Sequence, residues 1–587
     1  MPIRNRSLFL FLIIFFCIWL AACSTKPTLK SPDEEKSEHV SVGFRGGKIT
    51  YRLVSAPKTF NYLLADDEAS VMTAFFMLTS RLVEFDHRTQ TFVPGLAESW
   101  VVGTDGATVD VKLRDGLKFS DGTPLRADDV IFTLNAIYDD RTKSPVFRDS
   151  MMIDDKPIGT KRVSDTELMM IFPKPVASVE NYLSNLGVLS AAALEPELKG
   201  GTLAAAWTIN SPPASIVSSG PFVVQTAVPG ERVEYARNPN YWKKDKNGIQ
   251  LPYLDALNIE VIPDPNNTFG RLSQGSIDIA DRIRASDFSE LSKAGGDVRA
   301  SDIGPGLGID HLWFNLNATD PNGVALNNAV KRAWFGDKRF RQAIAMAIDR
   351  ESIASITLQG LATPLYGFVS PGNRVWLNPD QPKIRYDLSG AAKLLSEAGF
   401  NKTGTAENPV LVDVQKNPVD FTLIVPAESE ARKLIAGVIQ EDLAKLGVKM
   451  QIAPIDFPSL TQRWTKTYDY DAVLLGLSQN DTEPSSFANF LQSAAATHQW
   501  HPKQKTPATD WEARIDKLFA DQSAERDQTK RRAIFSEIQK IMFDEMPVLP
   551  VVARHAIGAA NKRVGNYSPS GILPYSLWNI DELYIKR

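Results

Sequence analysis

Alternating apolar and polar residues predict the first strands of the chain. Residues 48–53 alternate in this way and mark the start of a folded body. Residues 99–102 and 108–113 are two more extended runs, and Asp105-Gly106 between them is a dipeptide typical of hairpin turns. The pattern therefore predicts one strand followed by an antiparallel hairpin.

Apolar residues at helical spacing predict three helices. One begins near Ala127, and two acidic residues in its first turn have the sign that the helix dipole favours there. A second helix is expected over 338–349, after the candidate N-cap Asp337. A third is expected over 390–398 and ends at Gly399, because glycine commonly terminates helices.

Residues 421–477 give the clearest indication of the fold. Residues 421–425 form a strand pattern, and 430–446 form a helix pattern that ends at Gly447. The helix is expected to bury one side, which consists of Leu434, Ile435, Val438, Ile439 and Leu443. Alternation over 448–452 then predicts a second strand. A strand–helix–strand unit implies a parallel pair, so we expect an α/β lobe.

A further strand over 470–477 leads into the polar stretch GLSQNDTEP, residues 476–484. Polar residues and a proline after a strand are also ordinary turn chemistry, and that is the simpler interpretation. Open α/β sheets, however, bind ligands at the carboxyl ends of their strands. This stretch follows such an end, so it is a better ligand-site candidate than an average turn.

The N-terminus has the pattern of an export signal. Arg4 and Arg6 form a basic start, and the apolar run 8–20 is too short to span a bilayer comfortably. Leu20-Ala21-Ala22-Cys23 resembles the bacterial lipoprotein box, which implies cleavage before Cys23 and lipidation of its sulfur. The alternative is a secreted protein that is cut nearby. We expect an extracytoplasmic protein, in the periplasm or at the cell surface, that Cys23 anchors to a membrane.

Composition narrows the class of protein. Residues 24–47 are rich in Lys, Ser, Pro, Glu and Gly, which predicts a flexible tether. The chain has 587 residues, so at least two lobes are expected. Cys17 would leave with the signal and Cys23 would be lipidated, which leaves no cysteine for a disulfide, a metal site or a nucleophile. Lys and Arg number 65 against 69 Asp and Glu, so the chain lacks the basic footprint of a nucleic-acid-binding protein.

The sequence contains no recognisable catalytic or cofactor motif. HExxH, Walker, GxSxG and Rossmann glycine patterns are all missing. His498 and His501 have a spacing that could place two imidazoles on one helix face. No carboxylate or cysteine accompanies them nearby, so we interpret them as surface histidines rather than metal ligands. We expect no catalysis, no cofactor and no metal; the alternative is a surface hydrolase or a sensor lipoprotein.

Several short motifs together resemble a known family. They are PGLAESW at 94–100, KLRDGLKFSDGTP at 112–124, ADDV at 127–130, GPF at 220–222, RNPNYW at 237–242, GSID at 275–278, RFRQA at 339–343 and IDR at 348–350. This set is similar to the signature of family 5 extracellular solute-binding proteins, the peptide- and nickel-type binding components of ABC importers. The resemblance covers essentially the whole mature chain. One departure is Arg126, which stands where the family usually has Thr or Ser as the side-chain N-cap.

The resemblance implies an α/β, two-lobed periplasmic-binding-protein-like fold (type II, cluster C) with an extra domain inserted in lobe I. Carried onto this sequence, it implies a signal peptide at 1–22, the lipidated Cys23 and tether at 23–47, lobe I at 48–90, 215–310 and 555–587, the inserted domain at 91–214, and lobe II at 311–554. A ligand would lie between the lobes and stabilise their closed arrangement.

The resemblance also implies a set of ligand contacts in the stretch after 470–477. Peptide-binding members carry a pattern like Gly-Trp-x-x-Asp-x-x-Asp-Pro, and Leu477 stands where Trp is common. Asn480 stands where peptide binders use an aspartate to hold the α-ammonium of the ligand. The implied contacts are Gly476, Leu477, Ser478, Gln479, Asn480 and Asp481.

The asparagine leaves the charge of the site open, because an amide donates and accepts hydrogen bonds but carries no charge. Asp481 replaces the missing charge by a shift of one residue, the ligand lacks a free amine, or the acid comes from another loop. The implied function is a monomeric solute receptor that delivers peptides or peptide-like solutes to an ABC permease and its ATPase. A non-peptide solute such as an oligosaccharide or a metal chelate is the alternative.

Overall fold

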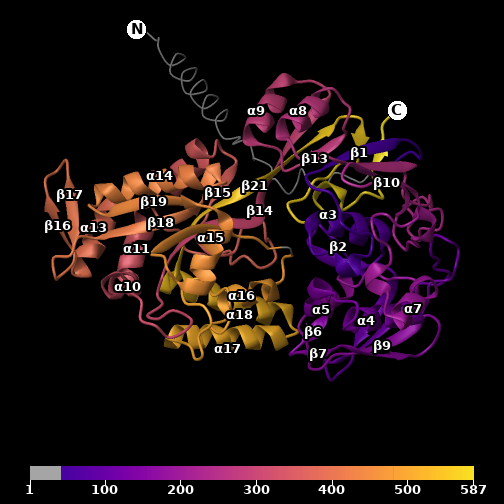
Figure 1. Ribbon diagram of the computed structural model, residues 1–587, viewed down its shortest axis with the longest axis horizontal. Helices are drawn as coiled ribbons and strands as arrows, with labels where there is room; N and C mark the ends of the chain where they lie inside the picture. The colour runs from indigo at the N-terminus through magenta and orange to yellow at the C-terminus, as the bar shows by residue number, and fades with distance from the viewer. Residues whose placement is uncertain (1–40, 480) are drawn as a thin grey trace, which may run out of the picture. The chain divides into compact units, whose positions relative to one another are not determined.

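A mixed sheet organises the part of the chain that the computed structural model describes, residues 41–479 and 481–587 (Figure 1). The expected signal peptide, Cys23 and nearly all of the tether lie outside the described residues, and so does Asn480. The sheet has eleven strands in the order β10-β11-β12-β1-β13-β21-β14-β20-β18-β19, with β15 paired to β21. Their bounds are β1 Lys48–Leu53, β10 Phe222–Val228, β11 Arg232–Arg237, β12 Ala256–Val261, β13 Ile279–Asp281, β14 Val298–Phe314, β15 Ala362–Pro364, β18 Asp420–Pro426, β19 Lys449–Ile455, β20 Ala472–Leu477 and β21 Val548–Asn561.

Two long antiparallel strands, β14 and β21, connect the two ends of this sheet. The first part of β14 pairs with Gly558–Asn561, and the same part of β21 also pairs with β13. The last part of β14 pairs with Val548–Ala553 on one side and with β20 on the other. Their register shifts between Asp302 and Ile309, around the glycine-rich segment 304–308. Such irregularities bend strands, so the break in register lies where the sheet passes from one set of strands to the other.

The sheet around β14, β18 and β20 carries a separate hydrophobic core on each face. Alternating side chains of β20 divide between them: Leu474 belongs to one core, and Val473 and Leu475 belong to the other. Helix α14, Glu430–Lys445, covers the first face with Ile435 and Ile439, as its position in Figure 1 indicates. Helices α17, Asp510–Ala524, and α18, Gln528–Glu545, cover the second. Burial on both faces explains why β20 has a continuous apolar run.

A second sheet forms between residues 97 and 171. Its strands are β4 Ala97–Val102, β5 Thr108–Leu113, β9 Glu167–Ile171 and β8 Gly159–Arg162, paired antiparallel in that order. Helices α4 Ala127–Tyr138, α5 Pro145–Met151, α6 Val179–Ser184 and α7 Ala191–Gly200 accompany it in sequence. Its core is continuous with that of β1 and β12. The domain bounds implied by the family resemblance remain a prediction.

The other described elements are shorter or connect these layers. The two-stranded pairs are β2 Val83–Asp86 with β3 Thr91–Pro94, β6 Met152–Ile153 with β7 Lys156–Pro157, β16 Asn401–Gly404 with β17 Pro409–Val412, and β22 Val564–Gly565 with β23 Tyr584–Ile585. The remaining α-helices are α3 Glu68–Ser70, α8 Pro265–Ser273, α9 Ala285–Ala294, α10 Ala329–Gly336, α11 Lys338–Met346, α12 Arg350–Ser352, α13 Leu388–Glu397, α15 Phe457–Gln462 and α16 Ala488–Leu491.

The predicted elements are present, with small changes at their ends. The strand–helix–strand unit is β18, α14 and β19, and its two strands pair in parallel as expected. One residue of the predicted buried side is wrong, because Leu434 is 55% exposed. Arg126 indeed provides no side-chain cap to α4; instead its backbone N–H donates to Asp129 at 2.8 Å. The acid in the first turn therefore caps this helix from within.

Candidate functional site

The carboxyl ends of β18 and β20 lie side by side and leave part of β20 unpaired. The two strands are parallel, and their ladder ends at Ile424↔Val473, whereas β20 continues to Leu477. On its other side β20 stays paired with β14, up to Leu477↔Ile309. Backbone groups beyond Val473 that point away from β14 therefore have no strand partner in the described residues. A strand end that has a partner on one side only can accept an extended peptide as an added strand.

Gly476 lies at this edge, where a larger residue would have to displace a neighbouring side chain. A Cβ at this position would stand 2.4 Å from Arg432 Nη2 and 3.1 Å from the carbonyl oxygen of Ile309. Arg432 comes from the first turn of α14 and passes directly over the end of β20. The glycine therefore makes room for a guanidinium group beside the open strand edge.

Arg432 shares a buried carboxylate with a second arginine. Asp310 on β14 is 1% exposed, and its Oδ1 accepts a hydrogen bond from Arg432 Nε at 2.8 Å. Arg554 on β21 brings its Nε to 2.8 Å from Asp310 Oδ2, with 45% of its side chain exposed. Two guanidinium groups thus share one carboxylate, which leaves one positive charge in excess. A partly exposed guanidinium in such a place can bind a carboxylate through paired hydrogen bonds.

The next residues of the predicted site leave the sheet. Ser478 is exposed and Gln479 is half-buried, and neither belongs to a strand. Ser478 lies opposite the glycine-rich part of β14, since a Cβ on Gly308 would be 3.7 Å from its Oγ. Asn480, on which the charge argument depended, lies outside the described residues. The structure therefore brings Gly476, Leu477 and Ser478 together at the strand end, next to the crossing strand.

Asp481 is a partly buried acid with no cation beside it in the described part of the chain. Its Oδ1 accepts the backbone N–H of Glu483 at 2.8 Å. Burial raises the pKa of the Asp481 carboxyl from 3.8 to about 6, and the neighbouring charge of Glu483 acts in the same direction. A carboxylate that has lost water without gaining a counter-ion is held in a state that a ligand ammonium would stabilise.

The residues after Asp481 are part of the scaffold. The carbonyl oxygen of Thr482 accepts a hydrogen bond from Asn373 Nδ2 at 2.8 Å. Glu483 Oε2 lies 2.7 Å from Arg531 Nη2, and the two side chains are only 8% and 6% exposed. The guanidinium of Arg531 also lies 4.7 Å from the ring centroid of Trp376. Glu483 therefore fastens the loop to α18, and its fit to the family pattern is explained by the fold.

The expectation that both histidines lie at the surface is wrong for His498. Its side chain is fully buried, its Nδ1 lies 3.0 Å from the carbonyl oxygen of Phe490, and its Nε2 faces Glu512. His501 is half-buried, and burial lowers its pKa. These residues also lie outside any helix. Within residues 41–479 and 481–587, no group of three or more His, Cys, Asp or Glu side chains is arranged to hold a metal ion.

Sequence reasoning missed Asp310, Arg432 and Arg554, although two of them have a detectable pattern. Asp310 lies in the mostly apolar second half of its strand, residues 307–314, where a buried acid is unusual unless a partner is present. Arg432 lies in the first turn of α14, where the helix dipole disfavours a cation. Both anomalies are consistent with a functional site. Arg554 gives no such signal, because an exposed arginine on a strand is common.

Comparisons with known proteins agree on one family. Residues 91–499 match the family model described as bacterial extracellular solute-binding proteins, family 5. A probable ABC transporter-binding protein of Deinococcus radiodurans is 28% identical over 88% of this chain and 89% of its own length. The dipeptide-binding protein of Escherichia coli is 25% identical over 90% of this chain and 93% of its own.

Solved structures show the same fold. The ABC transporter substrate-binding protein CtaP of Listeria monocytogenes superposes with a TM-score of 0.73 at 24% identity, over 92% of this chain and 100% of that one. NikA of Brucella suis, in complex with Fe(III)-EDTA, superposes with a TM-score of 0.74 at 20% identity over the same shares. The fold is thus the two-lobed α/β fold of these binding proteins. No helix in the described ranges is both long and apolar enough to cross a membrane.

Proposed function

Because the chain belongs to the bacterial extracellular solute-binding proteins of family 5, we propose that it captures peptides or peptide-like solutes for an ABC importer. The observation that carries this proposal is the open edge of β20. Two arginines share one carboxylate beside Gly476, and Asp481 has no cation beside it in the described residues. A peptide offers a backbone for the edge, a carboxylate for the cation and an ammonium for the acid.

The names of the relatives support this class of ligand. They include a dipeptide-binding protein of Escherichia coli and the oligopeptide-binding protein AppA of Bacillus subtilis, which is 26% identical over 93% of this chain. In the proposed mechanism Leu477, Ser478 and Gln479 contact the solute, Asn480 is a further contact implied by the family pattern, and the solute is held as the lobes close over it. The protein itself is not an enzyme; it passes the solute to a permease, and ATP hydrolysis takes place on another subunit.

The remaining parts of the proposal rest on sequence patterns. Lobe I comprises 48–90, 215–310 and 555–587, the inserted domain 91–214, and lobe II 311–554. The export signal and Cys23 make this protein a lipoprotein, and residues 24–47 hold the binding body away from the membrane. The proposal also includes that the protein acts as a monomer. Mass spectrometry of the mature protein from its host tests the anchor, since lipidation adds the mass of a diacylglyceryl group and acyl chain to the peptide that begins at Cys23.

The role of Asp481 is tested with an equimolar library of tripeptides, after native mass spectrometry has identified what co-purifies. We expect Asp481→Asn to weaken binding by about 10-fold or more, because a charge-assisted hydrogen bond contributes about 1.5–3 kcal/mol. Asn480→Ala should have a clearly smaller effect. The measurement is isothermal titration calorimetry with the tightest tripeptide.

A matched ligand separates charge from shape. The same tripeptide with an acetylated N-terminus should bind wild-type protein as weakly as the free peptide binds the Asp481→Asn variant. Equal and small effects of the two substitutions would remove this loop from the site. Small-angle scattering gives an independent test of closure: a tightly bound peptide that leaves the radius of gyration unchanged would contradict the two-lobe mechanism.

A further inference from the structure

The turn of the β2–β3 hairpin contacts a loop that lies far from it in the sequence. Gln90 Nε2 donates to the carbonyl oxygen of Gly372 at 2.8 Å, and the N–H of Arg374 donates to Gln90 Oε1 at 3.1 Å. Arg374 Nη2 also donates to the carbonyl oxygen of Arg88 at 2.6 Å. By the domain bounds proposed above, Gln90 belongs to lobe I and residues 372–374 belong to lobe II. The side-chain amide of Gln90 therefore pairs with the backbone of the opposite lobe.

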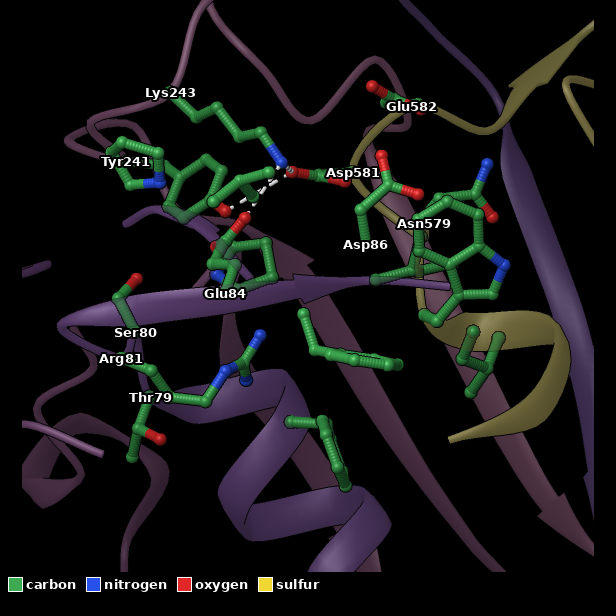
Figure 2. A pocket seen from close by; sticks show the side chains of 18 of the residues that line it. Thr79, Ser80, Arg81, Glu84, Asp86, Tyr241, Lys243, Asn579, Asp581 and Glu582 are labelled. Carbon is green, nitrogen blue, oxygen red and sulfur yellow. Dashed lines mark hydrogen bonds and ion pairs between the residues drawn. The ribbon is translucent and has the colours of Figure 1, made fainter. Parts of the chain in front are cut away.

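Buried charges fix the hairpin to the rest of lobe I. Lys243 Nζ lies 3.1 Å from Glu84 Oε2 on β2 and 3.0 Å from Asp581 Oδ2 (Figure 2). Although burial disfavours the ammonium, Asp581 and Glu84 raise the pKa of Lys243 well above its usual value, so the lysine stays charged. Next to the turn, Arg88 Nη2 lies 3.3 Å from Glu582 Oε2. The turn that carries Gln90 is therefore a fixed part of lobe I.

Gln90 has a backbone conformation that glutamine rarely adopts. Its φ is 55°, which lies in the left-handed region that favours glycine. Glycine is also a common residue in hairpin turns, and it would occupy this position without strain. Strain of this kind persists where the surrounding structure determines it, often at a functional site. The strained residue is the one whose side chain reaches the opposite lobe, which points to a role for that contact.

The same loop of lobe II contacts the crossing strand and the candidate site. Gly372 packs against β14, since a Cβ there would overlap the carbonyl oxygen of Pro305. Asn373 is 2% exposed, and its Nδ2 donates to the carbonyl oxygen of Thr482 at 2.8 Å, one residue from Asp481. Three consecutive residues thus touch the crossing strand, the loop after β20 and lobe I.

We propose that Gln90 and residues 372–374 form a latch between the lobes and that the loop after β20 positions this latch. A solute bound at Asp481 fixes the loop. The hydrogen bond from Asn373 to Thr482 then holds residues 372–374 where they pair with Gln90 in the closed form. Opening breaks both hydrogen bonds of Gln90, so the latch slows release of the solute. Gln90 is thus a positioning residue that touches no solute, and this inference rests on the proposed capture between closing lobes.

Gln90→Gly tests the latch without straining the turn. Glycine accepts a φ of 55°, so the thermal unfolding temperature should stay close to that of wild type. The dissociation rate constant of the tightest tripeptide should rise by about 10-fold, because two hydrogen bonds of the closed form are lost. The association rate constant should change by less than about 2-fold. Stopped-flow tryptophan fluorescence measures both. A weaker affinity that came only from slower association would overturn the latch.

Gln359→Gly is the matched control. Gln359 has the same φ of 55°, is exposed, and lies outside the latch. Its substitution should leave tripeptide release as in wild type. If the two glycine variants release the tripeptide equally fast, whether at the wild-type rate or faster, the latch is refuted.

Asn373→Ala tests the link between the latch and the loop after β20. It removes the hydrogen bond to Thr482 and should also speed tripeptide release. Because both residues act through one contact, adding Gln90→Gly to this variant should change the release rate by less than about 2-fold. Effects that multiply in the double variant would contradict the coupling through Thr482.

Hydrogen-exchange mass spectrometry separates this inference from the proposed function, because it needs no tripeptide. Wild type and Gln90→Gly are compared as purified, with the solute that each retains. Gln90→Gly should speed exchange in peptides that cover Arg374, whose N–H donates to Gln90 Oε1. Unchanged exchange there overturns the latch even if tripeptides bind. Faster exchange in a protein that binds no tripeptide would support the latch and refute the proposed class of solute.

Discussion

In the loop after β20, Glu483 lies 2.7 Å from Arg531, whereas Asp481 has no cation beside it in the described residues. The two acids are separated by one residue and share the same backbone turn. Glu483 points to α18 and is buried together with its partner. Burial raises the pKa of both acids, but Arg531 opposes the rise at Glu483, whereas no cation of the described residues opposes it at Asp481, which also keeps part of its surface exposed.

The same contrast holds for the arginines of the two regions. Arg531 forms an ion pair with one carboxylate, that of Glu483, and its guanidinium lies over the ring of Trp376. Within the described part of the chain, Arg432 and Arg554 both pair with a single carboxylate, that of Asp310. A charge that is paired within the protein stabilises the fold and leaves nothing for a ligand to neutralise. The unpaired charges lie at the open end of β20, where a ligand of opposite charge can neutralise them.

Removing Arg531 should produce the largest effect. Arg531→Met keeps much of the volume but leaves Glu483 buried without a partner, and we expect a loss of about 3–5 kcal/mol in unfolding free energy. The loss should be larger at pH 8 than at pH 5, because a buried acid with a raised pKa is destabilising only when it is ionised. Urea denaturation at both pH values measures it.

The double variant Glu483→Gln with Arg531→Met is the control. It removes the buried charge together with its partner and should recover much of the stability. If the single variant costs no more than an ordinary surface substitution, Glu483 and Arg531 do not form the anchor that the comparison requires. Tripeptide affinity of the folded fraction should stay within a few-fold of wild type.

Gly476→Ala tests the other region and should affect binding more than stability. The added methyl displaces the flexible end of Arg432, so we expect a stability loss of about 1–2 kcal/mol. Tripeptide affinity should fall by about 10-fold or more, because the guanidinium moves and the open edge is partly blocked. Thermal unfolding and calorimetry measure the two effects separately.

Gly437→Ala is the matched control, since Gly437 lies in the same helix as Arg432 and has nothing within 4 Å of its Cβ position. It should stabilise the protein by about 0.5–1 kcal/mol and leave affinity unchanged. If both alanines leave affinity unchanged, Arg432 is part of the scaffold, and the contrast between the two regions fails.

Local pattern was enough to predict the elements of the fold. β1, the β4–β5 hairpin, α11 and the β18–α14–β19 unit all follow from periodicity, capping residues and glycines, which act over a few residues. The prediction that Leu434 is buried is wrong, because helical spacing indicates which side of a helix is apolar but not how far the core extends across that side. The pairing of β14 with both β20 and β21 depends on contacts distant in sequence, and no local pattern could supply it.

The candidate site was predicted only in part, for a related reason. The stretch after β20 could be found because strand ends are visible in sequence. The charge of the site could not be predicted, because Asp310, Arg432 and Arg554 come from three other elements that meet only in the folded chain. The same holds for His498, which the short spacing to His501 presented as a surface residue although Glu512 and Trp500 enclose it.

The smallest expected effect is the pH dependence that Asp481 contributes to stability. Its pKa is about 6 in the folded state against 3.8 without the fold, so the folded protein takes up this proton more readily than the unfolded chain does. The contribution of Asp481 to the free energy of unfolding should therefore be largest below pH 4 and should decline as the pH rises through 6. Partial exposure limits the change to about 1 kcal/mol.

Asp481→Asn should lack this decline and be more stable than wild type at pH 7.5, by urea denaturation. A bound tripeptide should reverse the ranking, since its ammonium supplies the missing cation to wild type alone. If the two proteins show parallel pH profiles with and without peptide, Asp481 is as well compensated as Glu483, and the loop has one kind of acid rather than two.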